Sequence, residues 1–104
     1  MTLKEYLDNH CSSLTTHTAL TLWDTLRGLW PSLREPDACG GPDGTALLAW
    51  DDGCHHLEFE IKDRDIELYY LDRQTGHTVN FEHTNTTNIL QIMTVLGNTF
   101  IQLC

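Results

Sequence analysis

Apolar and polar side chains alternate in short runs along the middle of this chain, and that alternation constrains the fold more than any other feature. The clearest run holds Leu57, Phe59 and Ile61 between charged or polar neighbours, which is the period of a half-buried β-strand. Similar runs lie at residues 46–50, 66–71 and 77–82. The segments between them are rich in Asp and Gly, as turns are. The sequence therefore predicts a four-stranded antiparallel β-meander over residues 45–82.

Helical patterns flank the predicted meander on both sides. Thr2 and Glu5 form a capping-box pattern for a first helix that ends near His10, and a second helix continues until Pro31. After the meander, Thr84 or Asn85 can cap a third helix. Its apolar side is formed by Ile89, Ile92, Met93, Leu96, Phe100 and Leu103, and its other side has no charged residue.

These elements define an α+β fold in one domain of residues 1–104. Its segments are two N-terminal helices in residues 1–30, a connecting loop in 31–44, the four-stranded meander in 45–82, and a C-terminal helix in 84–103. The loop contains all three prolines, which supports its assignment as a connection. We expect the C-terminal helix to pack on one face of the sheet.

The charge of the chain is concentrated in the predicted sheet. The formal net charge is −9, and residues 35–82 carry twelve acidic residues against three basic ones, which accounts for all of it. Nucleic-acid binding requires a basic surface, so this charge distribution argues against a nucleic-acid partner. It favours a basic protein partner, with a merely solvated acidic face as the alternative.

The termini and the cysteines bear on cellular location. The first residues lack the apolar core of a signal peptide, and no run is long enough to span a membrane. The four cysteines, Cys11, Cys39, Cys54 and Cys104, are widely scattered. We therefore expect reduced thiols, a cytoplasmic protein with no membrane partner, and an unused glycosylation sequon at Asn85.

Cys54, His55 and His56 are the most conspicuous group of metal-ligand residue types, with His77, Cys39 and His83 elsewhere in the chain. Structural zinc sites usually have paired ligands at short loop spacings, and that pattern is absent. Neighbouring residues on a strand also point to opposite faces, which separates His55 from His56. A metal or small-ligand site formed by Cys54, His55, His56 and His77 is kept as an alternative, and we expect no cofactor.

The polar face of the predicted sheet presents Glu58, Glu60, Glu67 and Tyr69 to solvent or to a partner. Glu58 and Glu60 lie about 6 to 7 Å apart on one strand face, which is near the separation of a catalytic acid–base pair. No pattern marks a pocket around them, and no nucleophile motif occurs. We therefore assign no catalytic residue, expect no enzyme activity, and predict that these four residues bind a partner.

Several short motifs between residues 41 and 76 resemble those of a group of small acidic bacterial proteins of unknown function. The motifs are Pro42-Asp43-Gly44, the run that ends at Trp50, Leu57-Glu58-Phe59-Glu60-Ile61, Tyr69-Tyr70, Asp72-Arg73 and Thr75-Gly76. The resemblance implies a compact α+β module. It implies no activity and transfers no functional residue.

The sequence thus leads to one principal functional hypothesis. It is a non-catalytic acidic module that binds a basic protein surface, for example as an antitoxin, immunity or anti-defence inhibitor. A metal-binding or small-ligand domain is the alternative hypothesis. A third is self-association into a homo-oligomer through the uncharged C-terminal helix.

Overall fold

The computed structural model of the protein describes residues 1–101, with side chains described for residues 1–94. Along this part of the chain, helices precede and follow a β-sheet. The elements are α1 (Leu3–His10), α2 (Ser13–Leu29), β1 (Asp37–Gly40), the short 3-10 turn η1 (Pro42–Gly44), β2 (Ala46–Asp51), β3 (His55–Lys62), β4 (Asp65–Asp72), β5 (Thr78–Thr84) and α3 (Thr86–Ile101). The predicted α+β class is confirmed.

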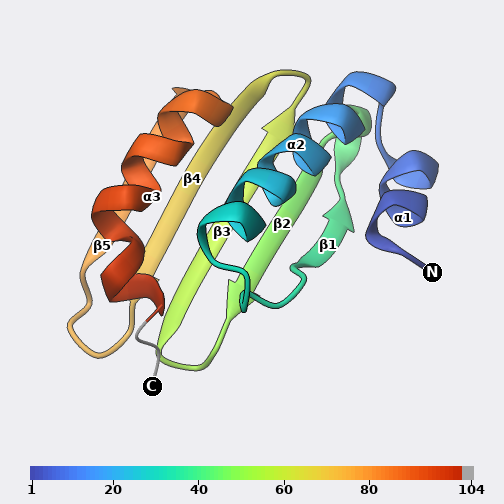
Figure 1. Cartoon of the computed structure of the whole chain (residues 1–104). Coiled ribbons are helices and arrows are strands. Elements are labelled where there is room, and N and C mark those ends of the chain that lie inside the picture. The colour runs from blue at the N-terminus through green and yellow to red at the C-terminus, as the bar shows by residue number, and fades with distance from the viewer. Residues whose placement is uncertain (102–104) are drawn as a thin grey trace.

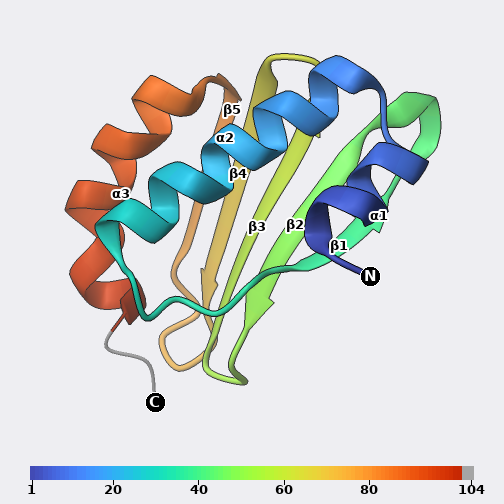
Figure 2. The same cartoon turned by 45° about the vertical axis from the view of Figure 1, so that its right-hand side comes forward.

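The sheet has five antiparallel strands in the order β1-β2-β3-β4-β5, so each strand pairs with its neighbour in the sequence. All three helices lie on the same side of this sheet (Figures 1 and 2). The described residues therefore form two layers, and none of their helices lies over the other face of the sheet.

The hydrophobic core fills the space between the helices and the sheet. On β3, Leu57, Phe59 and Ile61 are each at most 1% exposed, which confirms that the alternating apolar residues point toward the helices. The Trp50 ring lies 6.0 Å, centroid to centroid, from both Trp23 of α2 and Phe59. Aromatic and aliphatic side chains from both layers thus interlock around Trp50.

The predicted helix starts agree with the structure. The Thr2 hydroxyl accepts a hydrogen bond from the Glu5 backbone N–H at 3.1 Å, as expected for an N-cap. The Asn85 side chain accepts one from the Asn88 N–H at 2.9 Å, which identifies Asn85 as the cap of α3. On α3, Ile89 and Met93 are buried. Of the predicted apolar side of α3, Leu96, Phe100 and Leu103 lie outside the residues whose side chains are described.

The prediction of four strands is wrong, because residues 31–44 contain β1 in addition to connecting segments. Ala38 pairs with Leu48, and the Gly40 N–H donates a hydrogen bond to the Tyr6 hydroxyl of α1 at 2.9 Å. This strand has only four residues, and its two apolar residues, Ala38 and Cys39, are adjacent rather than alternating, so its sequence carries little strand signal. Pairing with β2 and contact with α1 stabilise it.

One hydrogen bond fixes the β3–β4 turn against α2. Asp63 begins this turn with a positive φ of 55°, and its backbone N–H donates to the Thr15 hydroxyl at 2.8 Å. Thr15 is only 1% exposed, and its hydroxyl also accepts a hydrogen bond from Ser12. The buried threonine therefore orients β3 and β4 relative to the helical layer.

Candidate functional site

The face of the sheet that has no helix over it is called the open face here, and it is the candidate functional site. Alternation along the strands and the strand register define its residues. They are Asp37 and Cys39 of β1, Leu47, Ala49 and Asp51 of β2, His56, Glu58, Glu60 and Lys62 of β3, Asp65, Glu67, Tyr69 and Leu71 of β4, and Thr78 and Asn80 of β5. Six of these residues are carboxylates, against one lysine.

The four residues predicted to bind a partner lie together on the open face. Glu58 is directly opposite Tyr69, and Glu60 is directly opposite Glu67, in adjacent rows of the β3–β4 pair. Glu60 is exposed, and the other three are half-buried. Because like charges directly opposite each other destabilise a sheet, the Glu60–Glu67 pair is a local cost that a cationic partner would relieve.

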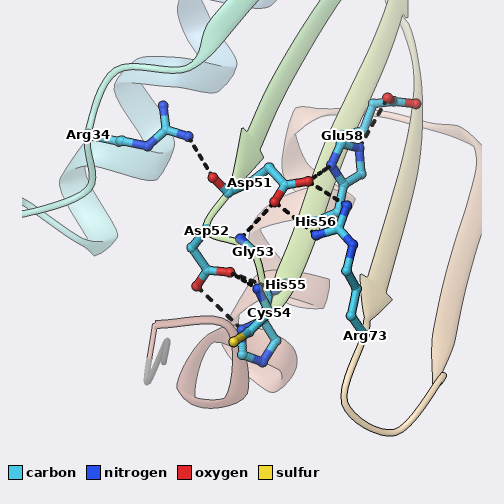
Figure 3. A network of polar contacts seen from close by, with 9 residues as sticks. All are labelled: Arg34, Asp51, Asp52, Gly53, Cys54, His55, His56, Glu58 and Arg73. Atoms are coloured by element: carbon cyan, nitrogen blue, oxygen red, sulfur yellow. Dashed lines mark hydrogen bonds and ion pairs between the residues drawn. The ribbon is translucent and has the colours of Figure 1, made fainter.

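A polar network at one end of the open face links β2, β3 and the turn after β4 (Figure 3). The Arg73 guanidinium donates two hydrogen bonds to the Asp51 carboxylate, at 2.8 and 2.6 Å. His56 contacts the same carboxylate through Nδ1 at 2.9 Å and contacts Glu58 Oε1 through Nε2 at 3.3 Å. The network therefore connects one of the predicted binding residues, Glu58, to an arginine–aspartate pair.

The network also joins the turns at this end of the sheet. The Asp51 carboxylate accepts a hydrogen bond from the Gly53 N–H at 2.8 Å, within the β2–β3 turn. The Arg73 backbone N–H donates to the Cys54 carbonyl at 2.8 Å, which places the β4–β5 turn beside the β2–β3 turn. Backbone and side-chain contacts thus hold Arg73 in position to pair with Asp51.

Hydrogen bonding lowers the pKa of the carboxylates in these turns. At Asp51 the hydrogen bonds from Arg73, from the Gly53 N–H and from His56 hold the pKa well below its usual range. At Asp52, desolvation by itself would raise the pKa, but hydrogen bonds from the His55 and Cys54 backbone N–H groups lower it. At Asp72 the Gln74 and Thr75 N–H groups likewise outweigh desolvation and lower the pKa.

The structure separates the residues predicted as metal ligands. His55 is 7% exposed on the helix side, where its ring stacks with Tyr70 at 6.1 Å, whereas His56 lies on the open face. His77 is exposed just before β5. Within the described residues, no group of three or more metal-ligand side chains is close enough to hold an ion.

The expectation of reduced thiols is wrong for Cys54, which is disulfide-bonded and so offers no thiolate to a metal. Cys11 is a half-buried free thiol, and burial raises its pKa. Cys39 is an exposed free thiol on β1, and His83 pairs with Asp65 at 3.3 Å. Cys104 lies outside the described residues.

Sequence reasoning missed Asp51 and Arg73 as members of the site. Both residues were interpreted only as parts of turns, and they are 22 positions apart in the chain. The signal that could have found them is the register of the meander, which brings its alternate turns to the same end of the sheet. Opposite charges in two such turns are then candidates for a pair.

A groove of about 460 Å³ lies on the other side of the molecule, between α2 and the start of α3. Its lining includes His17, Thr21, Arg64 and Asn88. None of the residues predicted from the sequence to bind a partner or a metal lies in it. It is therefore separate from the open face.

Comparison of the chain with models of known protein families, with curated proteins and with solved structures finds no match. Among the described residues, no helix combines the length and apolar character needed to cross a membrane. The functional interpretation therefore rests on the open face itself.

Proposed function

We propose that this chain is a non-catalytic protein-interaction module whose open face binds a basic protein surface. The observation that carries the proposal is that all three helices cover one face of the sheet, while Glu58, Glu60, Glu67 and Tyr69 lie together on the other. Acidic side chains on a flat surface complement a basic partner and increase its rate of encounter.

An inhibitor that occludes a basic surface of its target is one biological form of such a module. Antitoxin, immunity and anti-defence inhibitors belong to this class, and the resemblance to small acidic bacterial proteins is consistent with it. A cytoplasmic location stays part of the proposal. Reduced thiols do not support it, because Cys54 is disulfide-bonded and disulfides are rare in that compartment.

The experiment is affinity capture from an extract of the source cells, at low and at high salt, with three versions of the tagged protein. The first is wild type. The second carries Glu58→Lys and Glu60→Lys on the open face, and the third carries Glu5→Lys and Glu35→Lys on α1 and before β1. Each pair of changes takes the formal charge from −9 to −5, since every Glu→Lys adds two.

The proposal is supported if wild type and the Glu5/Glu35 variant retain a basic partner that the Glu58/Glu60 variant does not. High salt should also release this partner, because exposed charge pairs are screened over about 8 to 10 Å. Equal retention by both variants contradicts the assignment of the open face. Circular dichroism of each variant confirms that the fold is retained.

Self-association through α3 is a second proposal. The exposed side of its described part carries Asn88, Gln91 and Thr94 without a charged residue, and Leu90 is 37% exposed. Light scattering over a range of concentrations tests it, and a monomer at the highest concentration contradicts it.

A further inference from the structure

His56 occupies a position that links the polar network to the binding face. Its two ring nitrogens contact two different carboxylates, Asp51 on β2 and Glu58 on its own strand. Two other titratable or charged groups lie around it. Arg73, from the β4–β5 turn, donates to the Asp51 carboxylate that His56 contacts, and the Tyr69 ring of β4 has its centroid 6.3 Å from that of His56. Its surroundings therefore come from three strands and a turn.

The contacts of Asp51 determine which nitrogen of the neutral ring carries the proton. Asp51 accepts two hydrogen bonds from Arg73 and one from the Gly53 N–H, so its carboxylate is ionised and can only accept. A neutral ring can donate to only one of its two carboxylates, and His56 Nδ1 lies 2.9 Å from Asp51 Oδ2 whereas Nε2 lies 3.3 Å from Glu58 Oε1, so the shorter contact places the proton on Nδ1. In the neutral ring Nε2 consequently has a lone pair, and this lone pair faces Glu58 Oε1 at 3.3 Å.

Protonation of His56 reverses this second contact. A proton on Nε2 turns an unfavourable approach of lone pair and carboxylate into a charge-assisted hydrogen bond. Glu58 is then held by the imidazolium, and its charge is partly neutralised. In the neutral state of the ring, Glu58 is released toward the open face.

We propose that His56 makes the open face pH-dependent: the charged imidazole holds Glu58 and weakens binding of a basic partner, and the neutral imidazole frees Glu58 to bind it. This inference rests on the proposed function, since it concerns the same face and the same partner. A histidine is suited to the role because its charge changes between about pH 5 and 8.

The test measures the affinity of a synthetic octa-arginine peptide at about pH 8 and about pH 5.5, on either side of the histidine range and at constant ionic strength. Wild type is compared with His56→Gln and with the matched control His77→Gln, which changes an exposed histidine before β5. We expect wild type and His77→Gln to lose about fivefold more affinity on acidification than His56→Gln does.

Each other result overturns a defined part of the account. If wild type and His56→Gln lose the same affinity on acidification, the role of His56 is wrong, but the assignment of the binding face still stands. No binding by wild type at about pH 8 and low salt contradicts both the pH dependence and the proposed function. Separately, ¹⁵N NMR of wild type must show Nδ1 protonated at both pH values and Nε2 titrating, and a neutral ring protonated at Nε2 overturns the mechanism whatever the variants do.

Discussion

The two faces of the sheet use the same strands for different purposes. On β3, Leu57, Phe59 and Ile61 are buried under the helices, while Glu58 and Glu60 alternate with them on the open face. The helix-covered face removes apolar surface from water, and this is the main favourable contribution to folding. The open face keeps charged groups in solvent and holds two glutamates opposite each other. Stability and proposed function are therefore separated by a single position along one strand.

The largest expected effect tests whether the covered face carries the stability. Phe59→Ala removes a fully buried ring that packs against Trp50 and should lower the free energy of unfolding by about 3–5 kcal/mol. Glu60→Ala, one residue along the strand, should change it by less than about 0.5 kcal/mol. Urea denaturation of both variants measures the difference, and similar losses would contradict the division between the faces.

The next effect tests the connection between the covered face and the β3–β4 turn. Thr15→Val keeps the shape of the side chain but leaves the Asp63 N–H without its acceptor. We expect a loss of about 1–3 kcal/mol in the free energy of unfolding. Thr25→Val in the same helix is the control, because the Thr25 hydroxyl only donates to the Thr21 carbonyl within α2. If the two losses are equal in urea denaturation, the turn does not depend on Thr15.

The third test uses pH to examine the polar network of the open face. The pKa of Asp51 is lowered by folding, mainly through hydrogen bonds from Arg73. Its contribution to stability is therefore complete above the unfolded pKa of about 4 and is lost as the pH falls through the folded-state value. Asp51→Asn should unfold at a lower temperature than wild type at neutral pH, and the gap should narrow in acid.

Thermal unfolding followed by circular dichroism from neutral pH to about pH 2 measures this gap. Glu60→Gln is the matched control, since it neutralises an exposed carboxylate of the same face outside the network. A gap for Asp51→Asn that stays constant with pH would show that the carboxylate charge does not contribute through Arg73.

The smallest effect has the opposite sign and tests whether the open face is optimised for stability. Glu67→Thr removes one of two like charges that face each other across β3 and β4. We expect the free energy of unfolding to rise by about 0.2–1 kcal/mol. Adding Glu60→Thr to this variant should bring less gain than Glu60→Thr alone, because the repulsion is already gone. Chemical denaturation of the single and double variants checks this, and a loss of stability in Glu67→Thr contradicts it.

The covered face was predictable from the sequence because burial imposes a period. The alternation of Leu57, Phe59 and Ile61 indicated both a strand and the face that points inward. The strand β1 was not predictable in this way, because its stability depends on pairing with β2 and on the contact of Gly40 with Tyr6. Such contacts connect distant positions and leave no periodic trace in four residues.

The candidate site was predictable to the same extent as the strands that carry it. Glu58 and Tyr69 could be assigned to one face from alternation alone, and the register places them opposite each other. The bonding of Arg73 to Asp51 depends on how two turns meet in space, and the contact of His56 with Asp51 depends on the pairing of β2 with β3. The disulfide at Cys54 likewise depends on a spatial approach that scattered cysteines do not reveal.

Carboxyl footprinting of the complex with the captured partner tests the binding role of the open face most directly. Carbodiimide-activated labelling with an amine, read by mass spectrometry, reports the accessibility of each glutamate in the free and bound protein. We predict that labelling of Glu58, Glu60 and Glu67 falls on binding, while labelling of Glu5 and Glu35 does not change. Protection of Glu5 or Glu35 with no change at the three open-face glutamates would contradict the account.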